Sequence, residues 1–248
     1  MIQLSQMKSG NFLFIDIGNT RVKTCACVSN SLKSSKAWSI NDLSGLDDEI
    51  ANAETILICS VSVKNYNLIK GYLEGKSYRL INHELLRDYI DYETPESLGM
   101  DRVVAAVGAW KHFHKGSIVV DSGTASTIDM INDSGVFCGG VIMPGIGLME
   151  GAFRQYTELP AAERKRPSQW PPRSTENALK WGVTGSYLTA LSAHILKFKE
   201  ADPGLKVAVT GGDGHWVADM LENEFEIEVL EELVFRGMRE ISEKILSQ

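Results

Sequence analysis

The chain contains one turn pattern twice, and this repetition constrains its fold more than any other feature. An apolar run that ends in Asp is followed by a glycine-centred turn with Thr, in FLFIDIGNT at residues 12–20 and again in IVVDSGT at residues 118–124. After each turn the chain continues into a second strand-like segment, at 21–28 and at 126–132. Recurrence of one unit along a chain indicates an internal duplication, so we expect two related lobes.

Each turn has the composition of a phosphate-binding loop. Gly18 and Gly123 let the backbone approach a ligand closely, and the N–H groups of such turns donate to phosphate oxygens together with the hydroxyls of Thr20 and Thr124. A carboxylate such as Asp16 beside them suits Mg²⁺. Asp, Asn and Gly are also common in plain hairpin turns, which is how one copy alone would be interpreted. Two copies favour phosphate binding.

Composition limits the classes of function. The 248 residues, 44% of them hydrophobic, can bury a large core, and the net charge of −7 gives no basic surface for nucleic acid or an anionic membrane. No apolar segment approaches the ~18 residues of a membrane span, and residues 1–11 lack the apolar run of a signal peptide. We expect a cytoplasmic protein that acts on a small molecule. The four cysteines lack CxxC spacing and are expected to be reduced core residues: Cys25, Cys27, Cys59 and Cys138.

Strand-like and helix-like segments alternate, which predicts an α/β fold. Further strands are expected at 55–61, 118–120, 127–131, 136–143, 206–210 and 227–230, and helices at 40–49, 64–73, 101–114, 215–222, 233–246 and from Ser174 onward. The last of these helices carries an apolar i, i+4 stripe that is either core or a dimer interface: Leu179, Val183, Tyr187, Leu191 and Ile195. Residues 159–173, rich in proline and with a small basic cluster, are expected to form an exposed loop with solvated charges.

Two glycine-rich segments allow two interpretations each. The glycines at 139–147 permit either close backbone approach at a ligand site or a simple bulge. Gly211-Gly212-Asp213 after the strand at 206–210 either faces a nucleoside or is a plain strand-to-helix connection.

Several classes of chemistry lack their signatures. The chain contains no GxxxxGK[ST] loop, no HRD or DFG motif, no true GxGxxG, no GxSxG and no histidine spacing typical of zinc. Phosphoryl transfer by carboxylates, Thr hydroxyls, glycine turns and Mg²⁺ remains. It needs an acceptor for the hydroxyl proton, and Asp101 is our candidate, because it follows Gly99 at a helix start and adjoins Arg102, which can bind an anionic substrate. An ordinary first-turn Asp is the competing interpretation.

These residues together resemble the type III pantothenate kinases, within the superfamily of actin-like, sugar-kinase and heat-shock-chaperone ATPases. The matching positions are Asp16-Ile17-Gly18-Asn19-Thr20 with Lys23, Gly99-Met100-Asp101-Arg102, Asp121-Ser122-Gly123-Thr124-Ala125 with Thr127 and Asp129, Gly139-Gly140 with Pro144-Gly145, and Ser174-Thr175 with Ala178 and Gly182. The resemblance implies two ribonuclease-H-like lobes, at 1–115 and 116–248, with ATP in a cleft between them. It also implies transfer of the γ-phosphate to pantothenate, the first step of coenzyme A synthesis, by a homodimer whose partner subunit helps to close the substrate site.

The resemblance assigns a role to each matching residue. ATP phosphates and Mg²⁺ would be held by Asp16, Ile17, Gly18, Asn19, Thr20, Arg21, Val22 and Lys23, with Thr124 contacting ATP. Asp101 would accept the proton, and Asp121 would ligate an activating monovalent cation, K⁺ or NH₄⁺. Electrostatics supports this cation independently, because a carboxylate beside ATP phosphates suffers repulsion unless a cation lies between them. The pantothenate pocket would be lined by Tyr92, Gly99, Met100, Asp101, Arg102 and Thr175.

Two departures and two alternatives stay open. Residues 1–10 are expected to be a nonessential extension, and the loop at 165–173 follows no motif of the family. A regulatory protein that binds nucleotide without catalysis is one alternative, although intact Asp16, Asp101, Asp121 and Thr124 argue against it. A kinase of the same superfamily that acts on a sugar is the other.

Overall fold

The structure is a computed structural model that describes residues 11–247, so the expected extension at 1–10 lies outside the described residues. It divides into two compact units. The first contains the described residues up to His112, Gly135–Phe137 and the C-terminal segment from Glu232; the second contains Phe113–Ser134 and Cys138–Glu231. The C-terminal segment therefore lies in the first unit, although the expected lobe at 116–248 included it. The division at 115/116 stays a prediction.

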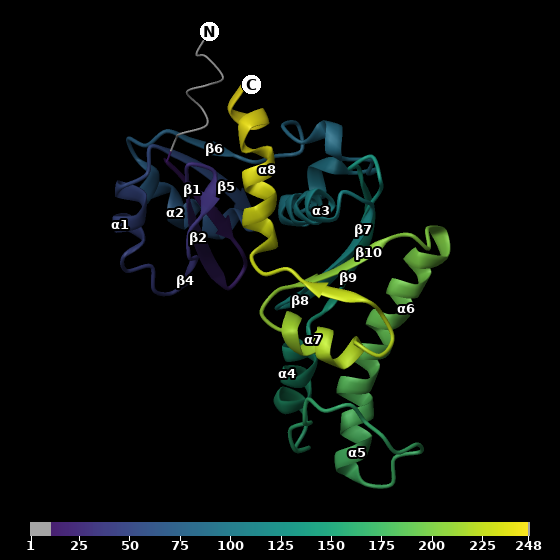
Figure 1. Cartoon of the computed structure of the whole chain (residues 1–248). Coiled ribbons are helices and arrows are strands. Elements are labelled where there is room, and N and C mark those ends of the chain that lie inside the picture. The colour runs from purple at the N-terminus through teal and green to yellow at the C-terminus, as the bar shows by residue number, and fades with distance from the viewer. Residues whose placement is uncertain (1–10, 248) are drawn as a thin grey trace. The chain divides into compact units, whose positions relative to one another are not determined.

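The first unit is built on a mixed sheet with the strand order β3-β2-β1-β5-β6, and β4 also pairs with β2 (Figure 1). Its strands are β1 (Asn11–Ile17), β2 (Arg21–Val28), β3 (Ser31–Leu32), β4 (Lys36–Ser39), β5 (Thr55–Ser60) and β6 (Tyr78–Leu80). β1 runs antiparallel to β2 and parallel to β5, and β5 runs parallel to β6. β1 is buried through most of its length because its run of Leu13, Phe14 and Ile15 supplies both faces of a central strand.

Helices cover this sheet and bury its apolar residues. They are α1 (Leu46–Ala51), α2 (Val63–Lys70), α3 (Met100–Phe113) and α8 (Leu233–Ser247), with short 3₁₀ turns at Gly71–Leu73, Arg87–Tyr89 and Pro95–Ser97. Leu46 and Ile50 of α1 and Ile69 of α2 share a core cluster with alternate residues of β1 and β5. The helix expected at 40–49 begins only at Leu46, because Gly45 before it adopts a left-handed φ of 88°.

α3 and α8 pack closely within the first unit. A side chain at Gly237 of α8 would clash with the backbone carbonyl of Val104 in α3. A side chain at Gly108 of α3 would lie 2.8 Å from the carbonyl of Leu233 and 3.0 Å from the backbone nitrogen of Gly237. α8 also contacts β1. The C-terminal helix α8 thus forms part of the core of the first unit, which also contains the N-terminal strands.

The second unit repeats the topology of the first. Its sheet has the order β11-β10-β7-β8-β9, in which β7 runs antiparallel to β8 and parallel to β10, and β10 runs parallel to β11. The bounds are β7 (Ser117–Ser122), β8 (Ala125–Ile131), β9 (Phe137–Pro144), β10 (Lys206–Thr210) and β11 (Ile227–Val229). In both sheets the strand that enters the turn is central, with its hairpin partner on one side and two parallel strands on the other. The repeated topology that the two turns predicted is confirmed.

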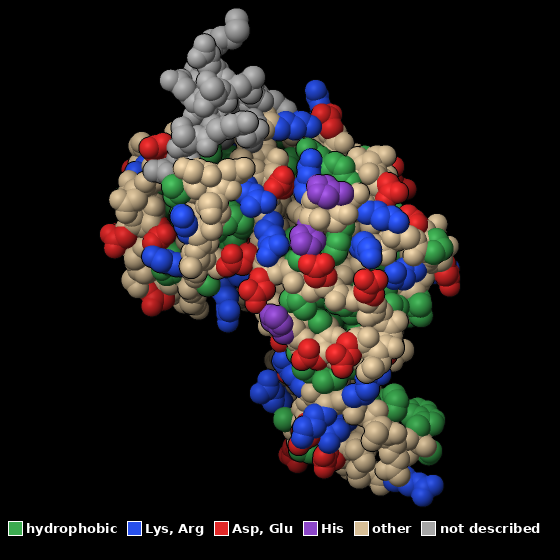
Figure 2. Space-filling view, viewed as in Figure 1, with side chains coloured by type: hydrophobic (Ala, Val, Ile, Leu, Met, Phe, Trp, Pro, Cys, Tyr) green, Lys and Arg blue, Asp and Glu red, His purple; other side chains and the backbone are tan. Residues whose placement is uncertain are grey.

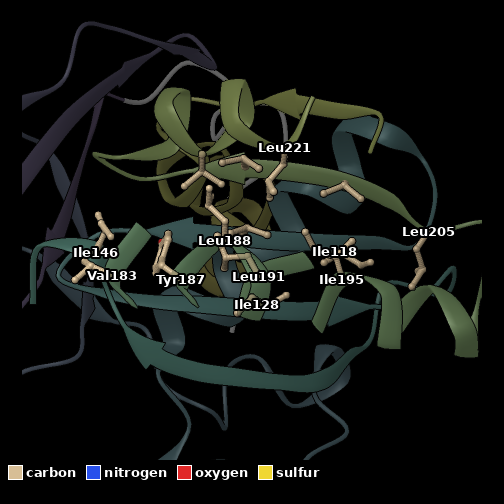
Figure 3. Packing of buried hydrophobic residues seen from close by; sticks show 14 residues of the cluster. Ile118, Ile128, Ile146, Val183, Tyr187, Leu188, Leu191, Ile195, Leu205 and Leu221 are labelled. Atoms are coloured by element: carbon tan, nitrogen blue, oxygen red, sulfur yellow. The ribbon is translucent and has the colours of Figure 1, made fainter. Parts of the chain in front are cut away.

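The core of the second unit lies between its sheet and its helices (Figure 3). The helices are α4 (Ile146–Tyr156), α5 (Thr175–Lys180), α6 (Ser186–Ala201) and α7 (Gly214–Leu221), and a π-helical turn at Trp181–Gly185 joins α5 to α6. Ser174 caps α5 by accepting a hydrogen bond from the backbone N–H of Asn177, as its helix-start sequence predicts. All five residues of the apolar stripe are buried, so of the two interpretations the stripe is core: Leu179, Val183, Tyr187, Leu191 and Ile195.

One cysteine differs from expectation. None of the four cysteines, all of which lie in the described part of the chain, forms a disulfide, and Cys25, Cys27 and Cys59 are buried as predicted. The prediction is wrong for Cys138, which is exposed. It lies on the edge strand β9, where alternation turns it outward between buried Phe137 and Gly139.

Across residues 11–247, no helix has the length and hydropathy needed to cross a bilayer. On the face shown in Figure 2, acidic and basic side chains are interspersed and do not form a continuous basic surface.

Candidate active site

The first glycine turn joins β1 to β2 and is anchored from behind by one buried amide. The N–H of Gly18 donates to the carbonyl of Arg21 at 3.0 Å, so the turn is a hairpin. Asn65 of α2 is only 4% exposed, and its side-chain amide donates to the carbonyls of Gly18 at 2.8 Å and Asn19 at 3.0 Å. The turn's carbonyls are thereby held toward α2, while the side chains of Asn19 and Thr20 are exposed.

Asp16 and Asp101 lie near the same buried thiol. Cys59 of β5 pairs with Asp16 of β1 in the parallel register. Burial raises the pKa of Cys59 well above its usual value, and the charges of Asp16 and Asp101 raise it further. Both carboxylates therefore belong to one region of the first unit, as the predicted roles of phosphate turn and proton acceptor require.

The segment before α3 fixes Asp101. Its carboxylate accepts a hydrogen bond from the backbone N–H of Arg102 at 2.8 Å, in the first turn of α3, where negative charge is favoured. A side chain at Gly99 would lie 2.7 Å from Oδ1 of Asp101, so the glycine leaves room for the carboxylate. The sequence Gly99-Met100-Asp101-Arg102 is thus organised around Asp101.

Two predicted pocket residues meet on an aromatic ring that sequence reasoning missed. Arg102 is 8% exposed and its guanidinium lies 5.5 Å from the centre of the Phe137 ring. Tyr92 packs on the same ring at 6.1 Å in a tilted arrangement. Phe137 reaches this position because it pairs with Ile90 and its carbonyl accepts from the N–H of Asp91. The sequence alone indicates only that Phe137 belongs to the strand expected at 136–143, with no local signal for its contacts with Tyr92 and Arg102.

The second glycine turn joins β7 to β8, and two other glycines contact it directly. The N–H of Gly123 donates to the carbonyl of Ala125 at 3.1 Å, which makes this turn a hairpin too. The N–H of Gly145 donates to the carbonyl of Thr124 at 3.1 Å, and a side chain at Gly145 would clash with the carbonyl of Gly123. Gly145 therefore packs closely against the second turn itself, and a close approach of the glycines at 139–147 to a ligand stays a prediction.

The Gly-Gly-Asp segment lies against the same turn. Gly211 has a left-handed φ of 91°, and a side chain there would lie 2.4 Å from both Oδ1 of Asp121 and the carbonyl of Ser122. The N–H of Asp213 donates to that carbonyl at 3.0 Å. The connection between β10 and α7 is thus positioned beside Asp121.

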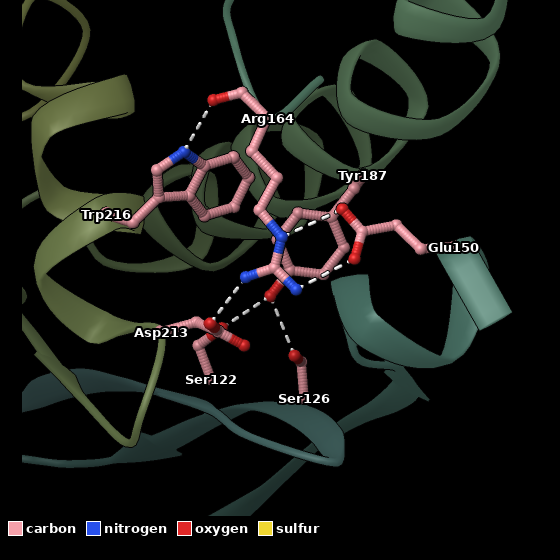
Figure 4. Close-up of polar contacts among 7 residues, drawn as sticks. All are labelled: Ser122, Ser126, Glu150, Arg164, Tyr187, Asp213 and Trp216. Carbon is pink, nitrogen blue, oxygen red and sulfur yellow. Dashed lines mark hydrogen bonds and ion pairs between the residues drawn. The ribbon is translucent and has the colours of Figure 1, made fainter. Parts of the chain in front are cut away.

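A buried polar cluster supports the second turn (Figure 4). The hydroxyl of Tyr187, a fully buried residue of α6, lies 2.7 Å from the hydroxyls of both Ser122 and Ser126. Burial raises the pKa of Tyr187, the two serine hydroxyls lower it, and Asp213 and Asp121 raise it. The Trp216 ring stacks on Tyr187 at 6.0 Å.

The basic residues of the 159–173 loop are not simply solvated, and that expectation is wrong for two of them. Arg164 forms a two-pronged ion pair with Glu150 at 2.8 Å and a third bond to Asp213 at 2.7 Å. Arg166 bonds to the carbonyl of Met220 and to Glu224. The partners are distant in sequence, so composition alone could not reveal them.

The predicted site residues thus form two groups, one in each unit. Asp16, Tyr92, Asp101 and Arg102 belong to the first unit, and Asp121, Thr124 and Thr175 to the second. Thr124 and Thr175 are exposed, and Thr175 begins α5. The approach of Asp16 and Asp121 across one crevice stays a prediction.

Solved structures share the fold of these two repeated sheets. A Campylobacter jejuni protein described as a Baf family transcriptional activator matches with a TM-score of 0.65 at 23% identity, over 95% of this chain and 100% of that one. The activator of the 2-hydroxyisocaproyl-CoA dehydratase from Clostridium difficile, with bound ADPNP, matches with a TM-score of 0.58 at 11% identity, over 96% and 97%. At these identities the likeness concerns the fold.

Sequence comparison identifies the family. Residues 12–197 match the model of type III pantothenate kinases. The type III pantothenate kinase of Methylacidiphilum infernorum is 33% identical over 201 residues, which cover 79% of this chain and 73% of that one. That of Flavobacterium johnsoniae is 27% identical over 218 residues, covering 85% and 89%. The chain belongs to the type III pantothenate kinase family.

Proposed function

We propose that the protein transfers the γ-phosphate of ATP to the hydroxyl of pantothenate, giving 4'-phosphopantothenate and ADP, the first step of coenzyme A synthesis. The observation that carries this proposal is the placement of Asp16 and Asp101 near the same buried thiol in a chain of this family. One carboxylate then serves the phosphates and the other the attacking hydroxyl.

Asp101 is the proposed general base. It accepts the proton of the pantothenate hydroxyl while that oxygen forms its bond to the γ-phosphorus and the bond to the β-phosphate oxygen breaks. The contact with the N–H of Arg102 orients the carboxylate, and the helix start stabilises its negative charge. The buried guanidinium of Arg102 suits the carboxylate of pantothenate, with Tyr92, Gly99, Met100 and Thr175 as the other proposed pocket residues.

The first turn is proposed to hold the phosphates and Mg²⁺ through residues 16–23. Among residues 11–247, no group of three or more His, Cys, Asp or Glu side chains could hold a metal. Mg²⁺ would be bound together with the nucleotide, because it takes one or two carboxylates, such as Asp16, with phosphate oxygens and water as the other ligands. When bound, the ion neutralises charge that develops on the phosphates.

The second turn is proposed to serve ATP through Thr124 and a monovalent cation, K⁺ or NH₄⁺, through Asp121. Asp121 is half-buried, and its Oδ1 and the carbonyl of Ser122 both face Gly211; carboxylate and carbonyl oxygens are suitable ligands for such an ion. A cation there offsets the repulsion between Asp121 and a triphosphate.

A cytoplasmic homodimer is proposed as the working form. Supporting it, α4 exposes large apolar side chains in the second unit, with Leu148 51%, Phe153 37% and Tyr156 78% exposed. Sedimentation at micromolar concentration tests this assembly, and a monomer with full activity would contradict it.

The test of function is ATP consumption with and without pantothenate, first in K⁺ and then in Na⁺, together with a panel of sugars. We expect turnover that requires pantothenate and is higher in K⁺. Turnover with a sugar would reassign the protein to a sugar kinase. ATP binding without turnover on any acceptor would favour a regulatory role instead.

A further inference from the structure

Arg164 links the loop at 159–173 to helices of the second unit. Arg164 is half-buried, and its guanidinium uses three nitrogens on two carboxylates from two helical regions. Glu150 comes from α4, and Asp213 directly precedes α7 (Figure 4). Hydrogen bonding to Glu150 is the largest cause that raises the pKa of Arg164, so the side chain stays charged. A planar fork with both carboxylates in place is a rigid connection.

Aromatic packing strengthens this connection. The Arg164 guanidinium lies 5.9 Å from the centre of the Trp216 ring, and the backbone carbonyl of Arg164 accepts from the Trp216 indole N–H at 3.0 Å. Trp216 in turn stacks on Tyr187, whose hydroxyl contacts the serines of the second turn. The side chain and the backbone of Arg164 thus both contact Trp216, which connects them through Tyr187 to the serines of the second turn.

Asp213 connects Arg164 with the second turn, because its carboxylate pairs with Arg164 and its backbone contacts the turn. Its N–H is bonded to Ser122 in the second turn, and Gly211, two residues earlier, packs against Asp121. Asp213 and Asp121 also both act on the pKa of Tyr187, so their charges lie near each other. Without Arg164, the Asp213 carboxylate would add an unneutralised negative charge beside a triphosphate.

We propose that Arg164 is a positioning residue for the nucleotide: it fixes the 211–213 segment against the second turn and neutralises Asp213, and so sets the affinity for ATP. This rests on the proposed function only in that the second turn meets ATP. It assigns a role to a residue of the 159–173 loop, for which the family resemblance implied none.

The test compares two arginines of the same loop. We expect Arg164→Met to raise the ATP dissociation constant, measured by calorimetry without pantothenate, by about 10-fold, the loss of one charge-assisted contact. Arg166→Met is the matched control, because Arg166 pairs with Glu224 rather than with Asp213. It should change that constant by less than about twofold, within the usual effect of a surface substitution.

A rescue variant separates positioning from general damage. Asp213→Asn added to Arg164→Met removes the unneutralised charge and should recover part of the lost affinity, whereas a merely unfolded loop would not recover. KM for ATP should rise in Arg164→Met while kcat and KM for pantothenate stay within about twofold. If Arg164→Met does not fold, Arg164→Lys keeps the charge, loses the fork and should show a smaller rise.

Three results would overturn the inference: unchanged ATP affinity in Arg164→Met, an equal loss in Arg166→Met, or no recovery with Asp213→Asn. Because calorimetry needs no acceptor, ATP binding by the wild type without pantothenate turnover would reject the proposed kinase function and leave Arg164 testable.

Discussion

The two glycine turns are alike in backbone and unlike in what supports them. Both are hairpins that follow a central strand whose next-to-last residue is Asp. The first is held by one neutral amide, Asn65, which bonds to two turn carbonyls. The second is held through side chains by Tyr187, and its neighbouring Gly-Gly-Asp segment is tied to charged Arg164.

The neighbours of the two aspartates differ as well. On the parallel strand beside Asp16 lies the buried thiol of Cys59, and in the same place beside Asp121 lies Thr210. The first turn has Asp101 nearby, while the second has close-packed glycines. A repeated hairpin therefore does not imply a repeated role: under the proposed function the first turn holds the phosphates and Mg²⁺, and the second turn serves ATP and a monovalent cation.

The largest expected effect tests the role of Asp101 as the proton acceptor. Asp101→Asn should lower kcat by about 10² to 10⁴ because the hydroxyl loses its proton acceptor, while ATP affinity is largely kept. Steady-state kinetics with pantothenate measures the first quantity and calorimetry the second. Asp88→Asn is the control, since Asp88 is exposed in the same unit and pairs with Lys244. Full activity of Asp101→Asn would remove Asp101 from the mechanism.

The sequence predicted both turns and most of the elements, because their signals are local, but it did not predict α4 or the short strands β3, β4 and β6. The strands at 21–28 and 206–210 have the expected bounds, and Asp101 lies in the first turn of a helix as its neighbours indicate. The supports were not predictable, because Asn65 lies 46 residues from Asn19 and Arg164 lies 49 from Asp213. A buried Asn in a helix, or an Arg in a proline-rich loop, carries no local mark of its partner.

The next effect concerns the support of the first turn. Asn65→Leu should lower the free energy of unfolding by about 2 to 3 kcal/mol, because two hydrogen bonds are lost and two carbonyls lose their buried donor. Urea denaturation measures the change. Asn67→Leu on the same helix is exposed and should change little. If both variants are equally stable, the Asn65 amide does not hold the turn.

The corresponding change in the second unit should be somewhat smaller. Tyr187→Phe removes one hydroxyl and leaves those of Ser122 and Ser126 buried without it, which should cost about 2 kcal/mol of unfolding free energy. Tyr156→Phe is the matched control, since Tyr156 is 78% exposed. Because Tyr187 supports only the second turn, ATP affinity should fall more than pantothenate affinity. A larger fall in pantothenate affinity would contradict the proposed role of the second turn in binding ATP.

The smallest expected effect is on the pH dependence of the unfolding free energy, which should differ between Cys59, beside Asp16, and Thr210, beside Asp121. The pKa of Cys59 is raised in the folded state by burial and by Asp16 and Asp101, whereas an unfolded thiol ionises near pH 8.5. Above that pH the unfolded chain releases a proton that the folded chain keeps, so stability falls as pH rises. Between pH 7.5 and 9.5 the loss from this thiol should be about 1.4 kcal/mol.

Serine substitutions isolate that loss, because a hydroxyl does not titrate in this range. Cys59→Ser should make the unfolding free energy less dependent on pH over this interval than in the wild type. Thr210→Ser, at the equivalent position beside Asp121, should leave the wild-type dependence unchanged. The other buried thiols, Cys25 with a pKa raised to about 11 and Cys27 with a raised pKa, are present in all three proteins and contribute equally. An unchanged pH dependence in Cys59→Ser would mean that this thiol ionises as easily in the folded protein as in the unfolded chain, and the two carboxylates could not then both lie close to it.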